Sequence, residues 1–181
     1  MFVNFYNNLK PYGRFATTGF LTGLICTFVW DVDDYGLIMT LMPGWLFGLV
    51  FIITLFTKAK LFSLLNIFKA LIWIPICGGC FLAAVEITSG GYIDLMNTSI
   101  GDDPNVLTPG IAGFVTTLVM VSAFYTLFEG LDIVDIISIS IIAAVVSLIG
   151  FYFYFLFVLY HFIISLCLGA AVMRKLNSLE S

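Results

Sequence analysis

Long apolar stretches alternate along this chain with short clusters of charged and turn-forming residues. A bilayer core about 30 Å thick needs roughly 20 apolar residues in a helix that crosses it. Cutting the chain at its charged and turn-forming clusters, and dividing its last apolar stretch, predicts six such helices, at 15–30, 37–57, 68–88, 109–128, 136–151 and 155–173. We therefore expect an all-α membrane protein, a six-span transmembrane helical bundle that forms a single domain over residues 1–181.

The last apolar stretch, 136–173, is too long for one crossing. At 1.5 Å per residue it would extend over about 55 Å, nearly twice the membrane core. We divide it near Gly150–Tyr154, where Tyr152 and Tyr154 could mark an interface. A five-span arrangement with one tilted final helix stays open as an alternative.

The basic residues predict how the bundle is oriented. Lys and Arg in short loops favour the cytoplasm, whereas acidic residues have little effect. With the N-terminus inside, all seven bases fall on the cytoplasmic side: Lys10, Arg14, Lys58, Lys60, Lys69, Arg174 and Lys175. Six spans then place the C-terminus in the cytoplasm as well. The start of the chain, with Phe2, Phe5, Tyr6 and Leu9 at near-helical spacing, is either an interfacial amphipathic helix or a loose tail.

Composition agrees with a lipid environment. The chain is 61% hydrophobic and 10% charged, with a mean hydropathy of +1.12, and these values lie outside the usual range of soluble domains. The lipid bilayer is thus the expected surrounding. A net charge of −4 without a basic run argues against nucleic acid as a partner. Short loops and the lack of a targeting extension favour a bacterial inner membrane.

Small residues predict where helices approach one another. Gly19 with Gly23, and Gly44 with Gly48, form two G-x-x-x-G patterns in apolar helices, where missing side chains let a second backbone come close. The partner helix could belong to this chain, to another copy in a homo-oligomer or to another membrane protein. Pro43-Gly44 and Pro109-Gly110 either begin two helices or mark a parallel duplication.

His161, the only histidine, lies near the middle of the sixth predicted span. An ionisable group at membrane depth is a functional hypothesis by default, so His161 could relay a proton or bind a solute. The alternative is a neutral imidazole that hydrogen-bonds a neighbouring helix. Glu86 closes the third span and is either a solvated carboxylate at the outer interface or, if it faces a cavity, part of such a site.

Pro75, Gly78 and Gly79 predict an interruption of the third helix near the middle of the membrane. Broken helices of this kind frame solute sites in many transporters. A simple kink filled by neighbouring side chains is the alternative.

Cys77 and Cys80 form a C-x-x-C pattern, which raises the possibility of thiol exchange with a quinone. Both sulfurs would lie deep in apolar surroundings, where thiolates are disfavoured, so the redox role is kept only as an alternative. We interpret the other two cysteines, Cys26 and Cys167, as packing residues. Further along, Glu129, Asp132 and Asp135 recur every third residue before the fifth span. They either complement the positive end of the helix dipole or contact a cation or partner protein.

No phosphate loop, metal-ligand spacing or serine nucleophile with a credible base occurs in the sequence, so neither an enzyme nor a metal or other cofactor is predicted. The pattern favours a small transport-type membrane protein that captures or passes a small solute or ion. Two alternatives stay open: a structural or interaction subunit that assembles a membrane complex, and a thiol oxidoreductase that uses Cys77 and Cys80.

Overall fold

The computed structural model describes residues 11–30, 36–59, 63–89, 108–128, 131–151 and 156–180. Within these ranges the chain forms helices and no strand. In chain order, the helices are α2 (Pro11–Trp30), α3 (Gly36–Ala59), α4 (Leu64–Ser89), α6 (Thr108–Phe128), α7 (Ile133–Phe151) and α8 (Leu156–Glu180).

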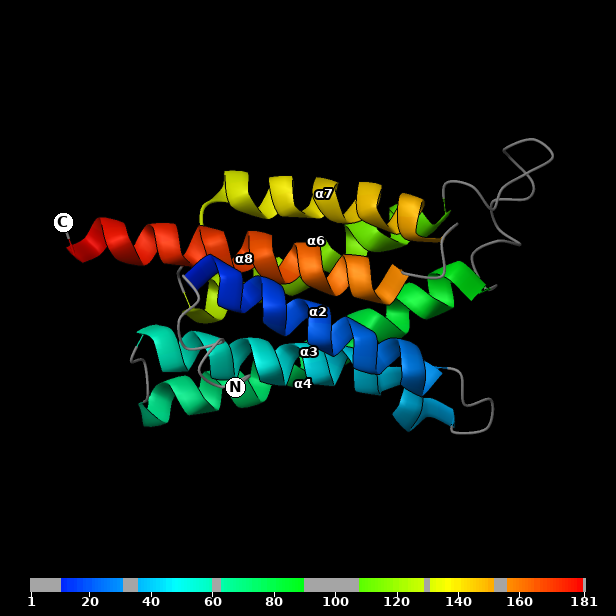
Figure 1. Ribbon diagram of the computed structural model, residues 1–181, viewed down its shortest axis with the longest axis horizontal. Helices are drawn as coiled ribbons and strands as arrows, with labels where there is room; N and C mark the ends of the chain where they lie inside the picture. The colour runs from blue at the N-terminus through cyan, green and yellow to red at the C-terminus, as the bar shows by residue number, and fades with distance from the viewer. Residues whose placement is uncertain are drawn as a thin grey trace.

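The six helices form a closed ring in the order of the sequence. Each helix packs against the next one along the chain, and α8 packs against α2 (Figure 1). Successive helices run in opposite directions along the bundle (Figure 1). As a result the start of α2 and the end of α8 lie toward the same end of the bundle, on the left of Figure 1.

The helices coincide with the six predicted apolar stretches and extend a few residues beyond most of them. The alternative of one long final helix is wrong, because α7 ends at Phe151, α8 begins at Leu156, and the two pack against each other. Among the described residues, three segments are long and apolar enough to cross a membrane: Leu64–Thr88, Thr108–Phe128 and Val158–Lys175. Leu41–Thr57 and Ile133–Ile149 are shorter apolar helices.

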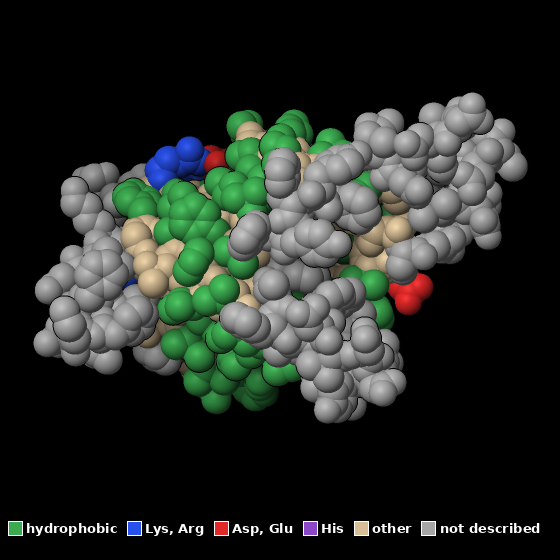
Figure 2. All heavy atoms as spheres, turned by 45° about the vertical axis from the view of Figure 1, so that its right-hand side comes forward, with side chains coloured by type: hydrophobic (Ala, Val, Ile, Leu, Met, Phe, Trp, Pro, Cys, Tyr) green, Lys and Arg blue, Asp and Glu red, His purple; other side chains and the backbone are tan. Residues whose placement is uncertain are grey.

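The outer faces of the bundle expose large hydrophobic side chains. Leu71 and Ile72 on α4 are 60% and 54% exposed, and Ile141 and Val145 on α7 are 51% and 49% exposed. On the face drawn in Figure 2, described hydrophobic side chains cover the middle, and charged ones show only toward the two ends. Such a surface suits acyl chains rather than water.

Aromatic rings fill the interior of the ring of helices. We call Phe15, Phe47, Phe51, Trp73 and Phe124 the aromatic core; each is at most 3% exposed. The Phe51 ring lies 5.1 Å from that of Phe15, 5.6 Å from that of Trp73 and 5.9 Å from that of Phe124, measured between centroids. Contacts of this kind bring α2, α3, α4 and α6 together around one centre.

Ion pairs join α7 and α8 at the end of the bundle that carries the described basic residues. Arg174 donates to both carboxylate oxygens of Asp135, at 2.7 and 2.8 Å. Asp132 lies 3.8 Å from Arg174 and 3.9 Å from Lys175. These two carboxylates therefore contact bases of the same chain at the start of α7, while Glu129 lies outside the described residues.

Candidate functional site

His161 lies inside the ring of helices, with its side chain 1% exposed. Three aromatic rings surround the imidazole: Phe47 of α3 at 5.3 Å, Tyr160 of α8 at 5.8 Å and Phe81 of α4 at 6.5 Å between ring centroids. Because Phe47 also belongs to the aromatic core, the imidazole is continuous with that core. A single ionisable side chain is thus held between three helices.

Hydroxyl groups accompany His161 in the interior. The hydroxyl groups of Thr117 on α6 and Tyr160 on α8 share a hydrogen bond in which either can donate. Thr18 and Thr54 make a similar bond of 3.1 Å between α2 and α3. Among the described residues no carboxylate is buried, so the buried polar groups are the imidazole, hydroxyl groups and, at the start of α2, the Arg14 guanidinium.

The position of His161 depends on the close approach of α2 to α8. A Cβ atom added to Gly19 would lie 2.7 Å from the Cβ of Ser165 and 2.8 Å from the carbonyl carbon of His161. The Ser165 hydroxyl also donates to the carbonyl oxygen of Phe15 at 2.8 Å. The missing side chain at Gly19 therefore lets the two backbones meet at the level of the imidazole.

The second glycine pattern lies between α3 and α4. A Cβ atom at Gly44 would come within 2.7 Å of backbone atoms of Cys77 and Gly78, and one at Gly48 would lie 3.2 Å from the Cys77 sulfur. Gly23, the other member of the first pattern, is buried. Gly19, Gly44 and Gly48 thus face helices of the same chain in this structure.

The expected interruption of the third helix is absent. Helix α4 is continuous from Leu64 to Ser89, with Pro75 in its interior. Proline removes one backbone donor and crowds the preceding turn, yet helices in membranes tolerate it where neighbouring helices support the segment. Of the two alternatives for Pro75, Gly78 and Gly79, the broken helix is therefore wrong, while the simple kink stays a prediction.

Pro109 and Pro43 occupy different places in their helices. Pro109 lies in the first turn of α6, as expected of a proline that begins a helix. Pro43 lies inside α3, seven residues after Gly36, so the prediction that it begins a helix is wrong.

The other predicted site residues do not gather around the imidazole. Pro75, Gly79 and Glu86 are all exposed, whereas His161 is buried. Gly78 is buried beneath the Trp45 indole, and a Cβ atom at Gly79 would meet nothing within 4 Å. Helix α4 approaches His161 through Phe81 instead.

The cysteines are all free thiols. Cys77 is 1% exposed and lies against Gly48, while Cys80 is partly buried. Thiol exchange at this pair would first require Cys77 to become accessible. Within the described part of the chain, no three His, Cys, Asp or Glu side chains gather as metal ligands would.

Sequence reasoning missed Phe47, Phe81, Thr117 and Tyr160, which surround or neighbour the imidazole. Tyr160 and Thr117 could have been suspected, because each places a hydroxyl group within an apolar span. The two phenylalanines carry no such signal in a chain with 19 of them.

A comparison of the chain with protein-family models, curated proteins and solved structures found no match. What the fold defines is a class: an all-helical bundle in which three described helices are long and apolar enough to cross a membrane.

Proposed function

We propose that this chain is an integral membrane protein of transport type, in which His161 is the polar centre that passes a proton or captures a small solute. The observation that carries the proposal is the burial of this one imidazole between Phe47, Phe81 and Tyr160, inside a closed ring of helices. An ionisable side chain at membrane depth is costly, and such residues mark solute and proton pathways.

The proposal includes six crossings with both termini in the cytoplasm. Its support is the distribution of the described bases: Arg14 near the start of α2, Lys69 near the start of α4, and Arg174 and Lys175 near the end of α8. Alternating helix directions bring these positions to one end of the bundle, which the positive-inside rule assigns to the cytoplasm. A bacterial inner membrane remains the membrane that we propose.

The hydroxyl pair beside His161 supports a proton or a small polar solute over a bulky one. Tyr160 and Thr117 can each donate and accept a hydrogen bond, as a relay or a solute site requires. The aromatic core fills the interior next to Phe47. This packing suits a proton or a small solute better than a bulky one.

Reconstituted vesicles test this function. With a pH-sensitive dye inside and an imposed pH gradient, vesicles that contain the protein should lose the gradient faster than empty vesicles. His161→Phe should abolish the difference, because phenylalanine fills the site but carries no proton. Glu86→Gln, at an exposed position, is the matched control and should conduct like the unmodified chain.

The result that contradicts proton transfer is equal decay in protein-containing and empty vesicles. The same vesicles, loaded with small neutral and charged solutes, then test capture or passage of a solute. His161→Gln, which preserves hydrogen bonding, separates loss of a proton carrier from loss of folding, and helical content by circular dichroism checks both variants.

A second candidate is a structural or interaction subunit that assembles a membrane complex, either with further copies of this chain or with another membrane protein. The observation that favours it is the dense aromatic core, with Phe15, Phe51, Trp73 and Phe124 packed into the ring interior. Since Gly19 and Gly44 face helices of the same chain, a partner would use the outer faces instead. Unchanged flux together with stoichiometric co-purification of a membrane protein would favour this function.

A further inference from the structure

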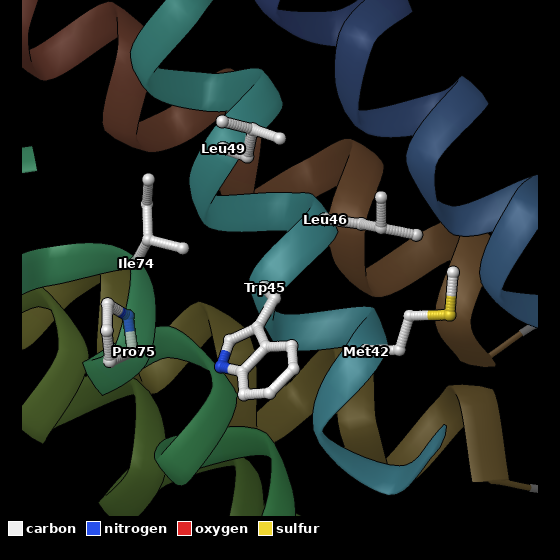
Figure 3. Close-up of a pocket in the computed structure, with 6 residues that line it drawn as sticks. All are labelled: Met42, Trp45, Leu46, Leu49, Ile74 and Pro75. Carbon is white, nitrogen blue, oxygen red and sulfur yellow. The ribbon is translucent and has the colours of Figure 1, made fainter. Parts of the chain in front are cut away.

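A shallow groove opens on the outer surface between α3 and α4. Its walls are Met42, Trp45, Leu46 and Leu49 from α3, and Ile74 and Pro75 from α4 (Figure 3). The volume is about 330 Å³, and no polar surface is exposed in it. Trp45 and Leu49 are 36% and 44% exposed, so the groove is continuous with the hydrophobic exterior.

The backbones explain why the groove forms here. Gly44 and Gly48 bring α3 close to α4 beside Cys77, and the Trp45 indole lies over Gly78. Figure 3 shows Trp45 extending from α3 toward α4 on the side of Pro75.

We propose that an acyl chain of a bilayer lipid occupies this groove. The proposal depends on the bundle lying in a membrane, but not on the transport function. An acyl chain needs no hydrogen bonds, and a groove that exposes no polar surface offers none. At about 330 Å³ the groove has room for one slender apolar chain.

The groove gives an acyl chain more contacts than a smooth helix surface does. Dispersion contacts are individually small and collectively large, so a chain that touches two helices is favoured over one that touches a single helix. No hydrophobic driving force adds to this, because the surrounding lipid is equally apolar. The acyl chain should therefore prefer the groove and still exchange with the bilayer.

The fluorescence of Trp45 can detect an acyl chain in the groove, because lipids brominated in the middle of the acyl chain quench a tryptophan that they contact. The chain has three tryptophans, so Trp30→Phe with Trp73→Phe leaves Trp45 as the single emitter. Trp30→Phe with Trp45→Phe leaves Trp73, which is 0% exposed and reports on a position shielded from lipid. A third protein lacks all three native tryptophans and carries Val115→Trp on the smooth exposed face of α6.

Val115 is a suitable reference because it is 43% exposed. At 1.5 Å per residue it lies about 10 Å from the start of α6, and Trp45 lies about 13 Å from the start of α3. In vesicles with a low fraction of brominated lipid, Trp45 should lose a larger share of its emission than the Val115→Trp protein, and Trp73 should lose least.

Equal quenching of Trp45 and the Val115→Trp reference would overturn the site, because the groove would then hold lipid no better than any exposed face. Protection of Trp45 to the level of Trp73 would also overturn it, and would show that a second copy or another protein covers the groove. Circular dichroism of the three proteins checks that each retains its helices, and Trp45 alone in unbrominated vesicles sets the reference emission.

Discussion

Asp135 at the start of α7 accepts two hydrogen bonds from Arg174 near the end of α8, although the two residues lie 39 positions apart in the sequence. The Asp135 side chain is only 13% exposed, while that of Arg174 is 63% exposed. Asp135 also accepts a bond from the backbone N–H of Asp132 at 3.1 Å. One carboxylate thus caps α7 and joins it to α8.

Asp135→Asn should lower the free energy of unfolding by about 0.5 to 1 kcal/mol, because asparagine keeps the cap but loses the charge that attracts Arg174. Thermal unfolding in detergent measures the change, and the loss should shrink at high salt. Asp132→Asn is the control and should cost less, since its carboxylate lies 3.8 Å or more from both bases. An equal loss in the two variants would contradict the importance of the short pair.

Gly44→Ala should destabilise the bundle by about 1 to 3 kcal/mol, because the added methyl group meets backbone atoms that cannot move unless α3 and α4 separate. Gly79→Ala is the matched control on the partner helix, since a Cβ atom there meets nothing within 4 Å. Alanine is also the better helix former, by roughly 1 kcal/mol, so this control should be neutral or stabilising. Unfolding of the two variants in the same detergent decides the matter, and equal stability would contradict the close approach.

The hydrogen bond between Thr117 and Tyr160 should couple α6 to α8. A double-mutant cycle with Thr117→Val and Tyr160→Phe should give a coupling energy of about 0.6 kcal/mol and at most roughly 1.7, as for other interhelical bonds in membranes. Both substitutions preserve the shape of the side chain, so packing changes little. Strictly additive losses would show that the two hydroxyl groups do not stabilise each other.

The proposed orientation predicts opposite accessibility for Glu86 and Lys175. With the four native cysteines replaced by alanine, Glu86→Cys should react from the periplasmic side with a thiol reagent that cannot cross membranes. Lys175→Cys should react only after the membrane is opened. Intact cells and broken-cell membranes provide the two conditions. Reaction of both positions from one side would rule out an arrangement in which α4 and α8 end on opposite faces.

The helices were predictable from sequence because the information is local. Charged clusters such as Lys58 with Lys60 separate most of the apolar stretches, and the length of the last stretch shows that it holds two helices. The residues around His161 were not predictable in this way. The helices are apolar on most faces, so the sequence does not indicate which side turns inward, and Phe47 or Phe81 could equally have faced lipid.

The incorrect expectation for α4 has a similar physical origin. Pro75, Gly78 and Gly79 weaken a helix when considered alone, and they predicted a break. In the structure α4 packs closely on α3, with Gly78 beneath Trp45 and Cys77 against Gly44. The neighbouring helix therefore supports a segment whose own residues favour interruption, and local propensity gives no measure of that support.

The ring order of the helices has a consequence for biogenesis. Of the described helices α2 is synthesised first, yet the carbonyl oxygen of its Phe15 accepts a hydrogen bond from the Ser165 hydroxyl of α8, 150 residues later. Until α8 has been synthesised, Gly19 and the Phe15 carbonyl oxygen lack the backbone and the hydroxyl group that they contact in the finished bundle. A product that stops before α8 lacks the helix that packs against both α2 and α7, so the ring of described helices stays open.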